Sequence, residues 1–292
     1  MTLNSQITPV VLLAGLLAAP GLVQAQHYPV GAEGLKGPTL PPPGLYLRDY
    51  NFGYYASRYP GGPPNFQADA YVNAPRLIWL TDYKICGANY GMDVIVPFGY
   101  KHVKFMTPGG PFDHTSFGLG DIQIEPLLLA WHYTKFDLAA GYAIWAPTGE
   151  FSPARPDHLG LGHWGHMLTL GGTYYFDTEK TWALSALNRY EFNHAQEQTF
   201  TTPGQTYTVE WGLSKTLAKV WDVGLIGYWQ QQTTTSEGPG GPDKPGVVGL
   251  GPEISLACPK IMTFFSLRYA REMAAHDRPE GNTFSLTITK RF

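Results

Sequence analysis

Residues 283–292 read Thr-Phe-Ser-Leu-Thr-Ile-Thr-Lys-Arg-Phe, and polar and apolar side chains alternate along most of this stretch. Successive side chains of an extended chain point to opposite faces, so a period of two residues predicts a β-strand. The odd-numbered positions from Thr283 to Arg291 would form a polar face. The other face would carry Phe284, Leu286, Ile288, Lys290 and Phe292. Such a strand separates a polar environment from an apolar one.

Two earlier stretches have the same period. In 205–213, one face would carry Thr206, Thr208 and Glu210, and the other Tyr207, Val209, Trp211 and Leu213. In 119–131, we expect Leu119, Asp121, Gln123, Glu125 and Leu127 on one face, and Ile122, Ile124, Leu128 and Ala130 on the other. The pattern is therefore not confined to the end of the chain.

Twelve strands of this kind are predicted: 45–56, 68–81, 89–104, 117–132, 136–147, 163–177, 180–195, 205–218, 221–234, 246–257, 261–274 and 281–292. Strands of soluble sandwiches average ~5–6 residues, so these are too long for that class. A strand that crosses the apolar core of a bilayer needs ~9–11 residues, and these are long enough.

The connections alternate in length. Long ones rich in glycine and proline occur at 57–67, 105–116, 148–162, 196–204, 235–245 and, less clearly, 275–280, with shorter ones at 82–88, 133–135, 178–179, 219–220 and 258–260. This rhythm is typical of all-β, antiparallel up-and-down barrels of the outer membrane, with short periplasmic turns and longer outer loops. The alternative is a large soluble barrel or sandwich in the periplasm.

Aromatic residues gather near the strand ends, where the girdles of a membrane barrel lie. They are Trp79, Tyr100, Trp131, Trp145, Trp164, Tyr175, Trp182, Trp221 and Trp229. The composition agrees, because charged residues make up only 15% of the 292 and aromatic residues 14%. A net charge of −3 gives no reason to expect a nucleic-acid partner.

The first 25 residues resemble an export signal. Residues 9–17 are apolar but too few to span a bilayer, and Val23-Gln24-Ala25 fits a signal-peptidase site, which predicts cleavage after Ala25. Residues 1–9 lack the usual Lys or Arg, and a buried or anchoring helix is the alternative. No uncharged apolar run of 18 residues follows, so we expect no transmembrane helix.

Residues 26–44 are too rich in proline for a helix or a strand ladder. An even number of strands would place both ends of the barrel domain, 45–292, on the periplasmic side. We therefore expect 26–44 to enter from that side and to fold up into the lumen as a plug or gate. A loose periplasmic tail is the alternative.

Eight charged residues are predicted to face the lumen: Asp93, Asp121, Glu125, Arg189, Glu191, Glu210, Arg268 and Glu272. They could pair with one another and hold the barrel in shape. They could also form a constriction that selects solutes by charge and size. Both roles are compatible with a twelve-stranded barrel, whose interior is narrow.

Sequence motifs for catalysis, cofactors or metals are not evident. Gly160-Leu-Gly-His-Trp-Gly165 matches the dinucleotide-binding string but leads into a predicted strand, whereas that motif must open a helix. His163 and His166 would lie on opposite faces of a strand, a poor metal pair, and isolated histidines in loops are usually solvated. Cys86 and Cys258 fall in predicted turns, and their pairing stays open. We expect no enzyme, cofactor or metal.

Several motifs, in this order, resemble the "MetA-pathway of phenol degradation" family of outer-membrane proteins. They are Glu33-Gly-Leu-Lys-Gly-Pro-Thr-Leu-Pro-Pro-Pro-Gly-Leu-Tyr46, Gly87-Ala-Asn-Tyr-Gly91, Gly118-Leu-Gly-Asp121, Ile124-Glu-Pro-Leu127, Trp131-His132, Pro147-Thr-Gly149 and Gly227-Tyr-Trp-Gln-Gln231. The family is grouped with the long-chain fatty-acid channels. The resemblance implies an outer-membrane channel for passive uptake of small hydrophobic or aromatic compounds, with no catalytic residues.

An apolar entrance and two kinds of partner follow from this reading. Aromatic residues in or beside the outer loops could form the entrance: Phe105, Phe112, Phe117, Phe151 and Trp164. Outer-membrane lipids and lipopolysaccharide would surround the barrel, and Phe292 would be read by the barrel-assembly machinery. A lipid-modifying enzyme on a twelve-stranded barrel and a general polar-solute porin are the alternative functions.

Overall fold

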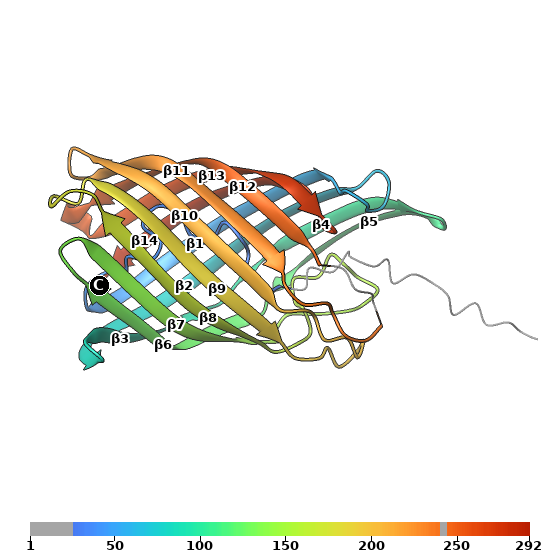
Figure 1. The fold of residues 1–292 in the computed structure, drawn as a ribbon. Coiled ribbons are helices and arrows are strands. Elements are labelled where there is room, and N and C mark those ends of the chain that lie inside the picture. The colour runs from blue at the N-terminus through green and yellow to red at the C-terminus, as the bar shows by residue number, and fades with distance from the viewer. Residues whose placement is uncertain (1–25, 240–243) are drawn as a thin grey trace, which may run out of the picture.

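The computed structural model describes residues 26–239 and 244–292, and Figure 1 shows them as one antiparallel barrel. The predicted signal peptide, 1–25, lies outside the described residues. The strands are β1 (Gly44–Arg58), β2 (Gln67–Ile85), β3 (Ala88–Ile95), β4 (Phe98–Thr107), β5 (Gly110–Leu119), β6 (Ile122–His132), β7 (Phe136–Ala146), β8 (Gly165–Tyr175), β9 (Trp182–Asn193), β10 (Thr206–Leu217), β11 (Trp221–Gln232), β12 (Gly246–Cys258), β13 (Thr263–His276) and β14 (Glu280–Arg291). One short 3₁₀ helix, Pro259–Ile261, lies between β12 and β13.

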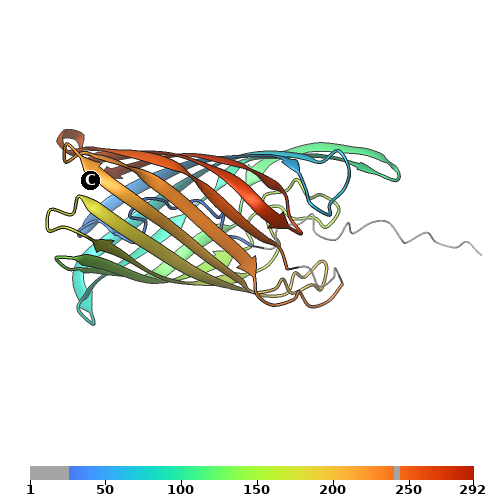
Figure 2. The ribbon, with the colours of Figure 1, turned by 45° about the horizontal axis from the view of Figure 1, so that its top comes forward.

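The sheet closes because β1 pairs with β14 on one side and with β2 on the other. The closed ring contains β1, β2, β3 and β6 to β14, which is the predicted antiparallel barrel of twelve strands. The two remaining strands, β4 and β5, form a hairpin that pairs with Gln67–Asn73 of β2. Figures 1 and 2 show this hairpin extending beyond the rest of the barrel. No helix of the described residues could cross a membrane.

Two predicted strands, 89–104 and 117–132, are each divided in the structure, and much of the loop expected at 105–116 belongs to the β4–β5 hairpin. The first division falls at Pro97, which has no N–H to donate to a ladder. The second falls at Gly120, whose N–H donates to Pro97 O at 2.8 Å, so the two breaks lie side by side. On the short-turn side of the breaks, β3 pairs with β6. On the loop side, β4 pairs with β5.

The long loop between β7 and β8 lies against the hairpin. Arg155 Nη2 donates to Ser116 Oγ of β5 at 3.0 Å, and Ser116 also hydrogen-bonds Asp157 of the loop. Within the described residues, the edge of β5 that faces away from β4 has no strand partner. Side-chain hydrogen bonds from the loop therefore hold this edge of β5, which has no backbone ladder to another strand.

Side chains alternate between the interior and the exterior as predicted for β10 and β14. Thr206, Thr208 and Glu210 are buried inside, and Phe284 and Leu286 are exposed outside. The prediction for 119–131 was wrong at both ends, because Leu119 and Leu127 face out and Leu128 faces in. Leu119 belongs to β5, which ends before the break at Gly120. The ladder between β6 and β7 shifts register between Ile124 and Leu127, around a proline that cannot donate.

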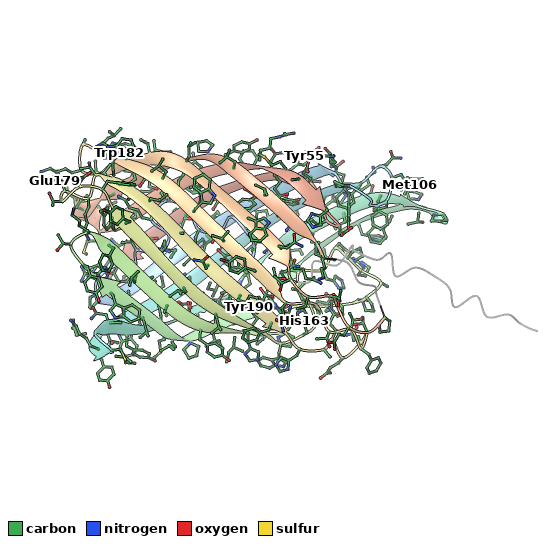
Figure 3. The ribbon with its side chains drawn as sticks, viewed as in Figure 1. Tyr55, Met106, His163, Glu179, Trp182 and Tyr190 are labelled. Atoms are coloured by element: carbon green, nitrogen blue, oxygen red, sulfur yellow. The ribbon has the colours of Figure 1, made fainter. Side chains whose placement is uncertain are left out.

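The short turns lie at one end of the barrel, together with the C-terminus, and the long loops lie at the other (Figure 1). Several aromatic residues near the strand ends are exposed on the outer surface, such as Trp182 at the short-turn end of β9 (Figure 3). The girdle prediction was wrong for Trp145 and Tyr175, which are buried. Cys86 and Cys258 are free thiols.

Two apolar clusters fill parts of the interior. The first, near the short turns, comprises Leu40, Tyr46, Ile78, Leu80, Leu128, Ala130 and Ala139. The second, near the loops, comprises Ala56, Phe66, Ala68, Val103 and Phe105. Two further clusters lie beside the charged groups of the interior: Val30, Tyr228, Val247, Ala270 and Ala275, and Tyr28, Ala143, Trp145 and Met167.

Substitutions at Leu80 test how closely the first cluster is packed, because the side chain of Leu80 is almost fully buried. We expect Leu80→Ala to lower the free energy of unfolding by about 2–5 kcal/mol, since the cavity would be left among packed neighbours. Leu80→Met preserves the volume and should cost less than about 1.5 kcal/mol. Urea unfolding of both variants in lipid vesicles measures the difference. Equal losses in the two variants would show that this cluster is not closely packed.

Candidate functional site

Residues 26–43, here called the lumen segment, run inside the barrel from the loop end to the short-turn end. His27 Nε2 is 3.2 Å from the carbonyl O of His163 in a long loop, and Lys36 Nζ donates to Asp222 Oδ1 at the short-turn end at 2.8 Å. Arg291 Nη2 donates to Pro43 O, just before β1 begins. The segment thus joins β1 at the short-turn end and extends through the lumen to Gln26 at the loop end. Its role as a plug or gate stays a prediction.

Three wall glutamates accept hydrogen bonds from the backbone of the lumen segment. Glu191 accepts from the N–H groups of His27 and Tyr28, at 2.8 and 3.2 Å. Glu210 accepts from Gly31 and Glu33, at 2.8 and 3.2 Å. Glu253 accepts from Leu35 at 2.8 Å. These carboxylates satisfy backbone donors that have no ladder partner.

The segment itself contributes one carboxylate, that of Glu33, which contacts the barrel wall. Arg48 Nη1 lies 3.4 Å from Glu33, Arg76 Nη1 lies 3.6 Å away, and Tyr50 Oη donates to it at 2.5 Å. Burial alone would raise the pKa of Glu33, but the surrounding guanidinium groups lower it to about 2. Glu33 is therefore ionised and bound to the wall at neutral pH.

The eight predicted lumen residues all lie inside the barrel. Glu191, Glu210 and Arg268 bind the segment, with Arg268 Nη1 donating to Ala32 O at 2.6 Å and Arg189 pairing with Glu210 at 2.5 Å. Asp93 and Glu125 share Arg76, at 2.5 and 2.9 Å. Glu272 accepts from Tyr54 and from the N–H of Gly281, and Asp121 lies beside His27. Their part in solute selection stays a prediction.

His27 links the segment to the long loop before β8. Its ring is enclosed between Asp121, at 3.4 Å, and Glu191, at 3.1 Å. Asp121 also accepts from the N–H groups of Gly149 and Leu161 in that loop, at 3.0 and 2.8 Å. Burial alone would lower the pKa of His27, but the two carboxylates outweigh burial and raise it to about 9. The charged ring thus holds the loop and the segment together.

His163 differs from the solvated loop histidine that the sequence suggested. Its side chain is buried, and its ring centroid lies 4.5 Å from that of His27. Burial, with the nearby charge of His27, lowers the pKa of His163 to about 4, so His163 is neutral when His27 is charged. Figure 3 shows His163 near the loop end of the barrel.

A cavity of about 1070 Å³ occupies the interior that the segment leaves free. Its part near the loops, here called the outer chamber, is walled mainly by apolar side chains: Phe52, Phe66, Ala68, Ala70, Val72, Val103, Phe105, Phe112, Phe151, Leu159 and Leu161. Phe105 and Phe112 stack with their ring centroids 4.8 Å apart. The whole cavity is large enough for a compound of several rings.

The structure places three of the five predicted entrance residues on this cavity. Phe105, Phe112 and Phe151 line it. Phe117 does not, because its side chain is 77% exposed on the outside of β5, and Trp164 is also exposed and outside the lining. Successive side chains of a strand point to opposite faces, so Phe117 points outward while the positions directly before and after it face inward.

The fold and the lumen together define a transmembrane β-barrel of the outer-membrane type whose interior is occupied by its own N-terminal segment. The chain belongs to the family described as "Putative MetA-pathway of phenol degradation", whose profile matches residues 49–288. The sequence-based resemblance to this family is thereby confirmed. No protein of curated function matches the chain.

Solved structures of low sequence identity share the fold. The COG4313 outer membrane channel from Pseudomonas putida F1 is 14% identical with a TM-score of 0.74, over 91% of this chain and 99% of that one. The beta domain of the Bordetella autotransporter BrkA is also 14% identical, with a TM-score of 0.51 over 85% and 99%. These likenesses establish the barrel architecture.

A substitution at Gly34 tests how closely the lumen segment packs against the barrel wall. A Cβ atom at this position would lie 1.7 Å from Glu253 Oε2, so Gly34→Ala must displace the segment or the carboxylate. We expect a cost of about 1–3 kcal/mol for seating the segment, and therefore roughly tenfold faster tryptic cleavage after Lys36. The matched control is Gly118→Ala, because a Cβ atom there meets nothing within 4 Å. Equal cleavage rates in both variants would contradict the fit.

His27 makes the seating of the segment depend on pH. Its pKa of about 9 lies above the ordinary 6.5, so its contribution is fully present below about pH 6.5 and is lost as the pH rises through about 9. The upper bound is about 3 kcal/mol. The measurement is the difference in unfolding free energy between the wild type and His27→Gln, at pH 6.5 and pH 10. A difference that stays constant over this range would contradict the ion pairing.

Proposed function

We propose that the protein is an outer-membrane channel for passive uptake of small hydrophobic or aromatic compounds. The observation that carries this proposal is the outer chamber, an apolar cavity with stacked aromatic walls inside a membrane-spanning barrel. Apolar solutes cross the lipopolysaccharide leaflet slowly, and a chamber of this kind offers them a lower free energy than water does. The family description, which concerns phenol degradation, is consistent with such a solute.

The lumen segment argues against a general porin. A polar-solute porin needs a continuous water-filled passage, whereas here the segment contacts β9 to β12 along its length and Arg48 and Arg76 of β1 and β2 through Glu33. Glu191 and Glu210 hold its first half, and Glu253 and Asp222 hold its second half. We infer that ions pass poorly while the segment is seated, and that solutes leave the chamber when it shifts.

The location proposed for the channel is the bacterial outer membrane, reached by export with cleavage after Ala25. The exposed aromatic residue at the C-terminus, Phe292, lies beside the first strand, where its N–H donates to Leu45 O at 3.0 Å. We propose that the barrel-assembly machinery reads this residue. Lipids and lipopolysaccharide would surround the exposed aromatic and aliphatic exterior.

The uptake experiment uses intact cells and N-phenyl-1-naphthylamine, an apolar aromatic dye that fluoresces on entering membranes. We expect the wild-type barrel to raise the initial rate of dye entry several-fold over cells with an empty vector. Ala70→Trp should remove most of this increase, because Ala70 lines the chamber and an indole would fill it. Tyr71→Trp, on the exposed face of the same strand, is the matched control. Equal dye entry with both variants would overturn the proposal.

The conductance experiment compares the chain from Gln26 with a version that lacks 26–43, both refolded in planar bilayers. We expect the first to be nearly silent and the second to conduct ions, because removing the segment leaves a lumen lined by charged groups. Strong and equal conductance of both proteins would favour the polar-solute porin instead.

A further inference from the structure

Lys101 differs from the other cations that line the cavity. Those at Arg48, Arg76, Arg189 and Arg278 each have a carboxylate within 4.0 Å. Arg268 donates to the backbone of the lumen segment and to Thr287. Lys101 Nζ makes one hydrogen bond, to the carbonyl O of His158 at a long 3.3 Å, and no ion pair within the described residues.

The surroundings of Lys101 offer little compensation for its charge. It lies on the inward face of β4 with Val103 and Phe105, which belong to the apolar cluster of the outer chamber. The carboxylate that acts on it from longer range, Asp157, is already bound by Arg155 through both oxygens, at 2.9 and 2.7 Å. An ammonium has three N–H donors, so two remain available to a molecule in the cavity. Lys101 is half-buried, and a charge that is partly removed from water without a partner is unfavourable, so an anion in the cavity would relieve this cost.

His158 places a second unused polar group beside Lys101. Its residue is 8% exposed, it lines the same cavity, and its Nδ1 has no hydrogen-bond partner. Its Nε2 lies 3.7 Å from Glu150 Oε1. In the imidazolium form both ring nitrogens donate, so Nε2 can face Glu150 while Nδ1 donates to another acceptor. Lys101 Nζ donates to the carbonyl O of His158, so the two residues are in contact.

We propose that Lys101 and His158 form a carboxylate-binding subsite of the outer chamber, and that the preferred solutes are organic anions with an apolar, aromatic body. This inference rests on the proposed channel function and names its substrate class. The carboxylate would accept from Lys101 Nζ and His158 Nδ1, while the rings pack against Phe105 and Phe112. Charge-assisted hydrogen bonds in an apolar cavity are stronger than neutral ones, so they would set the preference.

The test measures equilibrium binding to the full chain from Gln26 in lipid nanodiscs. The probes are 2-naphthoate and the neutral 2-naphthylmethanol, with binding to empty nanodiscs subtracted. We expect the wild type to bind 2-naphthoate at least tenfold more tightly than the alcohol. Lys101→Met should remove this preference by weakening only the naphthoate, and Lys101→Arg should retain most of it. His158→Phe should lower the affinity for naphthoate about threefold or more.

The matched control is Lys104→Met, on the outer face of the same strand, where Lys104 pairs with Asp113 at 3.2 Å. It should leave both affinities unchanged. The inference is overturned if the wild type binds the two probes equally, a result that needs no variant to fold. It is also overturned if Lys101→Met and Lys104→Met have the same effect.

Failure of the subsite and failure of the channel give different results. Dye entry with no preference for naphthoate would overturn the subsite and leave the channel function standing. A Lys101-dependent preference without dye entry would support an anion-binding chamber and overturn uptake of apolar dyes. The two experiments share no probe, so neither result follows from the other.

Discussion

An irregular peptide inside a β-barrel has no neighbouring strand, so the wall must satisfy its backbone N–H groups with side chains. Here Glu191, Glu210 and Glu253 do so for the lumen segment. Their charges then require compensation in the same low-dielectric space, and inward arginines such as Arg189 supply it. The charged interior of this barrel is thus a consequence of the segment that it encloses.

The same constraint explains why an apolar chamber exists at all. Near Asp121, His27 joins the segment to the loop before β8. Charged groups continue on the β13 side, where Glu272 pairs with Arg278 at 3.3 Å. Toward the loop end, no backbone from the segment needs partners, and β2 presents Ala68, Ala70 and Val72 to the interior instead of charges. The chamber is therefore the part of the lumen that the segment does not reach.

The barrel and its polar lumen were predictable because a period of two residues assigns faces locally, as in β10 and β14. The rule inverts in β2, where Asp69 and Asn73 face outward and bind His102 and Asp49, since the interior is apolar at that level. Distant contacts decide the breaks at Pro97 and Gly120 and the register shift near Pro126, so these features were not predictable from local sequence. Lys101 carried no local signal, because its isolation becomes visible only when its neighbours are known.

The two ends of the lumen segment are held by interactions of different strength. At the loop end, His27 is enclosed with two carboxylates. Separating such a buried ion pair is strongly unfavourable, because it leaves a buried charge without a partner. At the short-turn end, the pair of Lys36 and Asp222 is partly exposed, with side chains 19% and 25% accessible, and such pairs contribute little. Local opening proceeds from the less stable region, so the contacts of Lys36 with the wall should open before those of His27, while Pro43 stays joined to β1. A solute held in the outer chamber would then leave toward the short-turn end, away from the loops.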